Sequence, residues 1–163
     1  ELYFSLEEGA NGYSAGQYRI QFPFGPQPYD PMTLYDIDLS LVTAELQKAE
    51  RLVRDLKRLF HIGSLQTALD AYYQDQGMYP VTLAGITLGS GQTACLDDQG
   101  FGATCTETGS VYLQMVPANP IPNGAPYVYR SQSGIDYAIT YTLEANTLGL
   151  TEGVHTATPL GVQ

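Results

Sequence analysis

The chain has 163 residues, of which 44% are hydrophobic, and it contains 13 tyrosines and no tryptophan. This length and composition suit one folded domain with a hydrophobic core and exclude an intrinsically disordered chain. The formal net charge of −10 argues against nucleic acid as a partner, because binding to a phosphate backbone relies on basic residues.

The first 35 residues predict a β-hairpin followed by a proline-rich connector. Apolar and polar residues alternate in 2–7 and in 17–24, and the stretch between them is rich in Gly, which is typical of a hairpin loop. Four prolines between residues 23 and 31 predict a stiff, extended connector. No run of 18 apolar residues occurs, so we expect no transmembrane segment in this chain.

A long amphipathic helix is predicted to follow, starting near Asp36 or Asp38 and ending at about Gln76, just before Gly77 and Pro80. Apolar residues in its first half are spaced like a heptad seam, and those in its second half form another apolar face. We expect the second face to pack on a sheet and the seam to pack on the hairpin or on neighbouring subunits. The seam is Val42, Leu46, Ala49, Val53, Leu56 and Phe60, and the second face is Leu56, Leu59, Ile62, Leu65, Leu69 and Tyr72.

Five of the seven basic residues lie between positions 48 and 58. Only two acidic residues oppose them there, which leaves +3, whereas the rest of the chain carries −13. This basic belt is expected to attract acidic neighbours, including other copies of the chain, or anionic lipid head groups. The alternative is a solvated helix face with i,i+4 pairs such as Glu50–Arg54. The belt is Lys48, Arg51, Arg54, Lys57 and Arg58.

Cys95 and Cys105 predict a disulfide within the low-charge region 81–110, which otherwise reads as loop. No Cys or His nearby could complete a metal site with them. A disulfide implies an oxidising compartment, so we expect the protein at the cell surface, outside the cell or in the periplasm.

The last third predicts short strands, so the fold class is α+β: a long helix packed on an antiparallel β-meander. We divide the chain into residues 1–35, the hairpin and connector, and 36–163, the helix and sheet. The predicted strands are 111–116, 126–131, 135–143 and 154–158.

No catalytic constellation is evident, and we expect neither enzymatic activity nor a resident cofactor. Ser64 follows His61 by three residues, but no third group would orient such a pair. His155 stands alone and reads as a surface or interface residue. Asp97 and Asp98 read as solvated loop carboxylates.

Three segments in order carry a resemblance: the helix end LQTALDAYYQDQGMYP, the cysteine loop, and VPANPIPNGAPYVYRS with IDYAITYTLE. Over residues 45–163 the chain resembles type IV pilins and the major pseudopilin of type II secretion systems. The resemblance implies a structural subunit that self-assembles into a filament (a fimbrium or a pseudopilus). The expected assembly interface is Val42, Leu46, Ala49, Val53, Lys48, Arg51, Arg54, Ile20 and Phe22.

The resemblance also implies an apolar N-terminal stem, where residues 1–35 read differently. We therefore expect a soluble, engineered form or a relative that assembles differently, with a hairpin that either joins subunits or folds back on its own helix. The resemblance further implies a calcium site in the C-terminal loops, but Asn119 stands where an acid is expected. The remaining calcium candidates are Asp136, Glu144 and Glu152.

The alternative function is a monomeric minor pilin or adhesin-type module. Its binding segment would be the loop region 81–110.

Overall fold

The computed structural model describes residues 2–6, 16–20 and 39–163. The chain divides into two compact units, Glu1–Thr43 and Ala44–Gln163. In the first unit, β1 (Leu2–Leu6) pairs with the antiparallel strand β2 (Gly16–Ile20), so the predicted hairpin is present. The connector, Phe22 and the side chain of Ile20 lie outside the described residues.

One continuous helix, α1 (Leu39–Gln76), occupies the predicted range and is about 57 Å long at 1.5 Å per residue. It ends where the sequence indicated. The Gly77 N–H donates to the Tyr73 carbonyl over 2.8 Å, and Gly77 has a φ of 73°, the left-handed conformation that closes many helices. Among the residues that the structure describes, no helix combines the length and the apolarity that crossing a bilayer requires.

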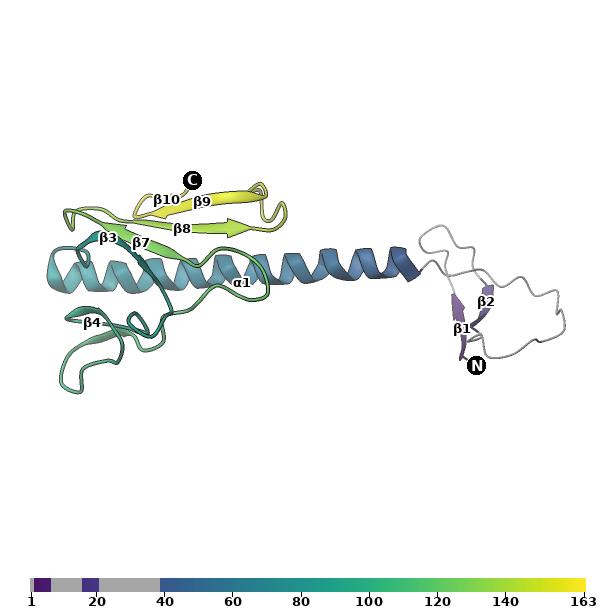
Figure 1. The fold of residues 1–163 in the computed structure, drawn as a ribbon, viewed down its shortest axis with the longest axis horizontal. Helices are drawn as coiled ribbons and strands as arrows, with labels where there is room; N and C mark the ends of the chain where they lie inside the picture. The colour runs from purple at the N-terminus through teal and green to yellow at the C-terminus, as the bar shows by residue number, and fades with distance from the viewer. Residues whose placement is uncertain (1, 7–15, 21–38) are drawn as a thin grey trace. The chain divides into compact units, whose positions relative to one another are not determined.

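Antiparallel strands in two sheets pack against α1, which confirms the α+β class (Figure 1). The larger sheet has the order β10-β9-β8-β7-β3, in which the predicted strands 126–131, 135–143 and 154–158 form a meander as β7, β8 and β9. The predicted strand 111–116 is shorter and belongs to the smaller sheet as β6, and β10 was not predicted. The smaller sheet has the order β5-β4-β6. The strands are β3 (Thr82–Thr87), β4 (Cys95–Asp97), β5 (Gly100–Gly102), β6 (Val111–Leu113), β7 (Val128–Ser131), β8 (Ala138–Leu143), β9 (Gly153–Thr158) and β10 (Gly161–Val162).

The region 81–110 is mostly loop, as the sequence suggested, but it also contains three strands that the sequence did not predict: β3, β4 and β5. Strand β3 pairs with the distant β7 and changes register between Thr82 and Ile86. Strands β4 and β5 form a short hairpin inside the disulfide ring. The sequences of β3, β4 and β5 (TLAGIT, CLD and GFG) are short and show little alternation of apolar and polar residues, so the pairing of these strands depends on contacts that local composition does not reveal.

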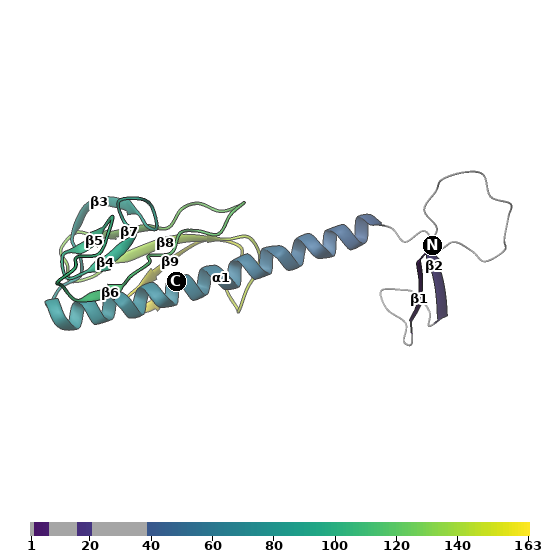
Figure 2. The same ribbon diagram turned by 90° about the horizontal axis from the view of Figure 1, so that it is seen from below.

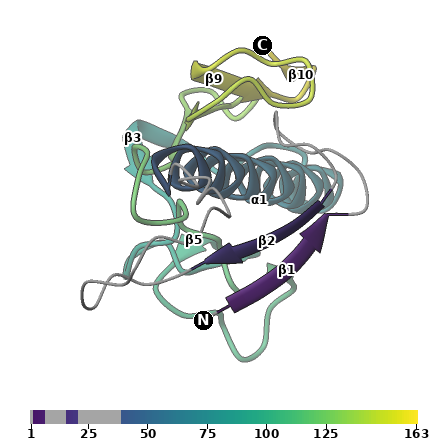
Figure 3. The same cartoon turned by 90° about the vertical axis from the view of Figure 1, so that its right-hand side faces the viewer.

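The core lies between the second half of α1 and the sheets. Ile62, Leu65 and Leu69 are at most 1% exposed. Opposite them, buried and half-buried residues alternate along β8, the period expected of a strand with one covered face. Figure 2 shows the strands of both sheets alongside the half of α1 that ends at Gln76, and Figure 3 shows β9 and β10 on one side of α1 and β5 of the smaller sheet on the other. Tyrosines fill much of this core, which accounts for the high tyrosine content of the chain. The buried ones in the sheet region include Tyr127, Tyr129, Tyr137 and Tyr141.

One member of the predicted second face is not in the core. Leu56 is 47% exposed, whereas Leu59 is half-buried and packs against the core, and the face from Ile62 onward is buried. Leu56 precedes Leu65 by nine residues, or two and a half turns, so the two side chains leave opposite sides of the helix. Leu56 therefore belongs to the seam alone.

The predicted disulfide joins Cys95 and Cys105, whose Cα atoms are 5.4 Å apart. Asp97, expected in solvent, is buried. Its carboxylate accepts the backbone N–H groups of Gln99 at 3.0 Å and Thr106 at 2.7 Å. The Asp97 carboxylate therefore stabilises the turn between β4 and β5 and holds the segment after Cys105 next to it.

Replacing Leu69 by Asp should unfold the domain or lower the free energy of unfolding by several kcal/mol, because an unpaired carboxylate would enter the core. Lys48→Asp is the control, since the Lys48 side chain is 68% exposed, and its effect should stay within about 0.5 kcal/mol. Urea denaturation measures both. Similar losses in the two variants would show that the buried face is wrongly identified.

Candidate assembly surface on the helix and its anchoring ion pairs

A line of five exposed apolar residues runs along the part of α1 that belongs to the second unit. We call it the helix row. Leu46 is 58% exposed, Val53 64%, Leu56 47% and Phe60 74%, and Ala49 between them is exposed as well. Val42, the first member of the predicted seam, lies in the other unit and is also exposed. A contiguous apolar line of this kind on a surface marks an interaction site more often than scattered apolar residues do.

The helix row lies on the face of α1 opposite to the core. Val53 precedes Ile62 by nine residues, and Phe60 precedes Leu69 by the same distance, which is two and a half helical turns in each case. The sheets that bury Ile62 and Leu69 therefore approach from the far side. Within residues 44–163, the strands cannot cover the row and the core face at once.

A buried guanidinium lies where α1 first meets the sheets. Arg58 is fully buried, and its nitrogen atoms contact five oxygens. Two are carboxylate oxygens, from Asp55 at 2.5 Å and Glu144 at 2.7 Å. The other three belong to one loop: Asn119 Oδ1 at 2.8 Å, the Asn123 carbonyl at 2.5 Å and the Pro120 carbonyl at 3.4 Å.

The two carboxylates extend the network to the turn that follows β8. Asp55 is itself fully buried and accepts the backbone N–H groups of Glu144 at 3.0 Å and Ala145 at 2.9 Å. Arg54 forms a bidentate ion pair with Glu144: its Nε donates to Oε1 over 2.8 Å, and its Nη2 donates to Oε2 over 2.7 Å. This turn of α1 therefore binds two separate segments of the second unit, the loop at 119–124 and the turn after β8.

Asn119 and Gly124 explain the loop sequence around Arg58. The Asn119 amide accepts from Arg58 and donates to the carbonyls of Pro120, Asn123 and Gly124, a combination that a carboxylate could not provide. A Cβ atom on Gly124 would lie 2.7 Å from Arg58 Nη2, so this close approach requires glycine.

Only part of the predicted basic belt is available to a partner, because two of its arginines are paired within the chain. Arg54 and Arg58 are taken up by contacts within the chain, and Arg54 is also 4.0 Å from Glu50, as the solvated-face alternative predicted. Lys48, Arg51 and Lys57 are exposed, and Arg51, nine residues before Phe60, lies on the face of α1 opposite the helix row. Sequence reasoning missed the buried role of Arg58, although it precedes Ile62 by four residues and so falls on the core face.

The calcium candidates are not brought together. Glu144 is paired with Arg54 and Arg58, Asp136 precedes β8, and Glu152 precedes β9. Among the described residues, no three His, Cys, Asp or Glu side chains lie close enough to hold a metal ion.

The histidines and Ser64 are placed differently from a catalytic pair. The Ser64 hydroxyl donates to the Phe60 carbonyl at 2.9 Å, while His61 Nδ1 lies 3.2 Å from the Tyr127 hydroxyl. Burial lowers the pKa of His61. His155, expected to be a surface or interface residue, is buried, with Nε2 2.7 Å from the Thr151 carbonyl.

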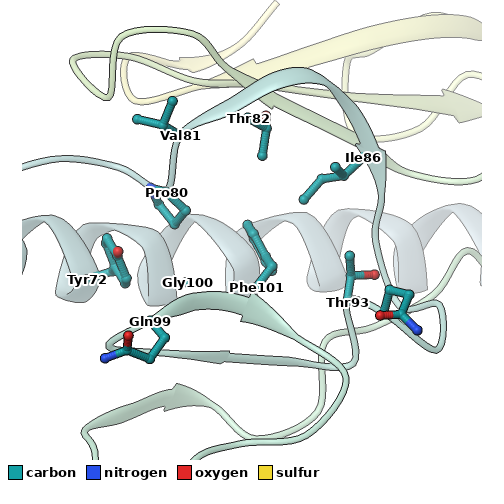
Figure 4. A pocket seen from close by; sticks show the side chains of 10 residues that line it. Tyr72, Pro80, Val81, Thr82, Ile86, Thr93, Gln99, Gly100 and Phe101 are labelled. Atoms are coloured by element: carbon teal, nitrogen blue, oxygen red, sulfur yellow. The ribbon is translucent and has the colours of Figure 1, made fainter.

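A cavity of about 310 Å³ lies between β3 and β5 (Figure 4). Tyr72 and Phe101 contribute aromatic rings to its lining, and Gln92 and Gln99 contribute carboxamides. None of its lining side chains is charged. Eight of its ten lining residues belong to the region 81–110 that the sequence suggested as the binding segment of the alternative function.

Comparisons of this chain with models of protein families, with characterised proteins and with solved structures found no match.

Arg58→Met should lower the free energy of unfolding by about 3–5 kcal/mol, because it leaves the buried Asp55 carboxylate without its cation. Arg51→Met is the matched control, since it removes the same charge from an exposed position on the same helix. Its effect should stay within about 0.5 kcal/mol. Chemical denaturation of both variants makes the comparison, and equal stabilities would contradict an anchoring role for Arg58.

Acid should weaken the network through Glu144. Hydrogen bonds from Arg54, above all, lower the pKa of Glu144 from 4.5 to about 2. A carboxylate with a lowered pKa stabilises the fold above its ordinary pKa, and this contribution is lost as the pH falls toward 2. The free energy of unfolding should therefore fall more steeply from pH 4.5 to pH 2 in the wild type than in Glu144→Gln. Parallel curves from denaturation at stepped pH would refute this role.

Proposed function

We propose that this chain is an extracytoplasmic, pilin-like structural subunit that self-assembles into a filament or pseudopilus through α1. The helix row carries the proposal. It is a continuous apolar line on a rigid helix, it faces away from the core, and the strands of its own unit do not cover it.

Another copy of the chain is the occupant that the row fits best. Its residues are spaced by three and four along α1, the spacing at which helices pack on apolar surfaces by inserting side chains between those of a partner. Complete burial of a Leu or Phe side chain contributes about 1.5–3 kcal/mol, and the row is already partly covered by its own helix, so each member would add on the order of 1 kcal/mol.

Contacts of this strength suit an assembly of many weak links. Association costs several kcal/mol in lost translation and rotation, so one helix row would give only a modest pairwise affinity. A filament overcomes this because each subunit makes several contacts at once. The buried ions at Arg58 and Asp55 support the same role, since they hold α1 in a fixed position against its sheets.

The disulfide and the order of the sequence segments also support the proposal. A Cys95–Cys105 bridge persists in oxidising compartments, which favours the cell surface, the periplasm or the extracellular space. The helix end, the cysteine ring and the Pro-Asn-Gly loop resemble those of type IV pilins and type II pseudopilins. The role requires neither catalysis nor a cofactor.

The cavity between β3 and β5 favours a second candidate, a monomeric binding module. Its uncharged lining, with aromatic rings and carboxamides, suits a neutral ligand better than an ion. A chain that stays monomeric at high concentration and binds neutral ligands there would favour this reading.

Val53→Glu should abolish self-association, because it places a charge in the middle of the row where a neighbour would bury it. Gln47→Glu is the matched control, since it adds the same charge on the same exposed stretch of α1 outside the row, and it should assemble like the wild type. Sedimentation velocity over a concentration series, with electron microscopy of any large species, is the measurement. Undiminished assembly of Val53→Glu would remove the row from the interface.

A further inference from the structure

The helix row combines large and small side chains, and it ends beside a glycine. Ala49 is its smallest member and Phe60 its largest. Gly63 follows Leu56 by seven residues, as Leu56 follows Ala49, so it continues the same line along α1. A Cβ atom on Gly63 would meet no atom of the described residues within 4 Å. Glycine inside a helix is destabilising relative to alanine, and no contact in the described part of the chain explains this one.

A second helix row that runs in the opposite direction matches these sizes. When Val53 of one copy lies level with Leu56 of the other, every large side chain of the row meets a smaller one or the gap at Gly63, as close packing of facing helices requires. A parallel pair would instead set Phe60 against Phe60 and Gly63 against Gly63, with crowding at one level and a void at the next. The level pairs of the antiparallel arrangement, each occurring twice, are Val53 with Leu56, Ala49 with Phe60, and Leu46 with Gly63.

The charged residues beside the row occupy both of its sides. At 3.6 residues per turn, Glu50 and Lys57 lie about 60° and 40° to one side of Val53, and Glu45 lies about 80° to the other side. All three are exposed. The contact of Glu50 with Arg54 within its own helix is long, at 4.0 Å, so its carboxylate remains accessible to a partner.

These charges favour the same direction as the side-chain sizes. In an antiparallel pair the same sides of the two helices meet, so Glu50 of each copy faces Lys57 of the other, about 3 Å away along the axis in the register given above. The pair therefore gains two ion pairs. In a parallel pair opposite sides meet, and Glu50 of each copy would face Glu45 of the other, a contact between like charges.

We infer that two copies of the chain pack their helix rows together in antiparallel orientation, with Val53 of one level with Leu56 of the other. This inference rests on the proposed assembly function and adds the geometry of its first contact. The pair is two-fold symmetric and uses both rows, so a filament would be built from pairs and grow through surfaces outside the row. The sheets leave the contact open, because they lie alongside the half of α1 that ends at Gln76 and on the face opposite the row (Figures 1 and 2).

Cross-linking of variants with one added cysteine tests the direction, since the chain's own cysteines are joined to each other. A mixture of Leu46→Cys and Gly63→Cys should form a one-to-one disulfide-linked dimer on mild oxidation, because the two positions are level. Leu46→Cys alone should not cross-link, since its two copies would be 17 residues, or about 25 Å, apart along the axis. Cross-linked Leu46→Cys alone, or a mixture that does not cross-link, would overturn the antiparallel contact.

Exchange of charges tests the same contact without cysteines. Lys57→Glu and Glu50→Lys should each weaken self-association about tenfold in sedimentation velocity, because two attractive pairs become repulsive. The double variant, and an equal mixture of the two single variants, should recover the wild-type affinity, since every facing pair is again opposite in sign. Arg51→Glu is the matched control for Lys57→Glu, because Arg51 is exposed on the opposite face of α1, and it should associate like the wild type.

Circular dichroism checks that each variant is folded, and the double variant carries the test if a single variant is not. Tighter association of Glu50→Lys, which a parallel contact with Glu45 predicts, would overturn the inference and leave self-assembly standing. A failure of the double variant to recover would do the same. A wild-type chain that remains monomeric would instead refute the proposed function.

Discussion

In the unit Ala44–Gln163, the position of α1 against the sheets depends on the guanidinium of Arg58. It is a fully buried cation held by oxygens from α1, from the loop at 119–124 and from Glu144 after β8. Removing charge from water is costly, and this cost is recovered only when the geometry satisfies every donor, as it does here with five oxygens. The arrangement therefore fixes where α1 enters the unit and how the two segments lie against it.

Downstream of this point, α1 is a core helix, and upstream it is exposed. The transition follows from helical geometry: the core residues from Ile62 onward and the helix row lie half a turn apart, so one side of α1 receives the sheets and the other does not. A single helix can thus hold a domain together and offer a surface to other molecules. The proposed assembly uses this division directly.

Rigidity links the fold to the proposed function. The ion pairs of Arg54 and Arg58, the tyrosine core and the disulfide at Cys95 all hold the sheets against α1. Weak apolar contacts can build a regular polymer only if each subunit presents them in a constant arrangement, because flexible partners lose entropy on ordering. The helix row belongs to this unit, so every copy presents it in the same arrangement.

The sequence by itself determined the helix, its end at Gly77, the disulfide, the α+β class and the spacing of the apolar seam, because periodicity, turn chemistry and cysteine spacing are local properties. It did not predict β3 to β5, the burial of Asp97 and His155, or the network around Arg58. Those features depend on partners far along the chain: β7 for β3, and Asn119 and Glu144 for Arg58. A charged residue reads the same in sequence whether solvent or oxygens from distant segments surround it, so only the tertiary structure decided which arginines are buried anchors and which remain on the surface.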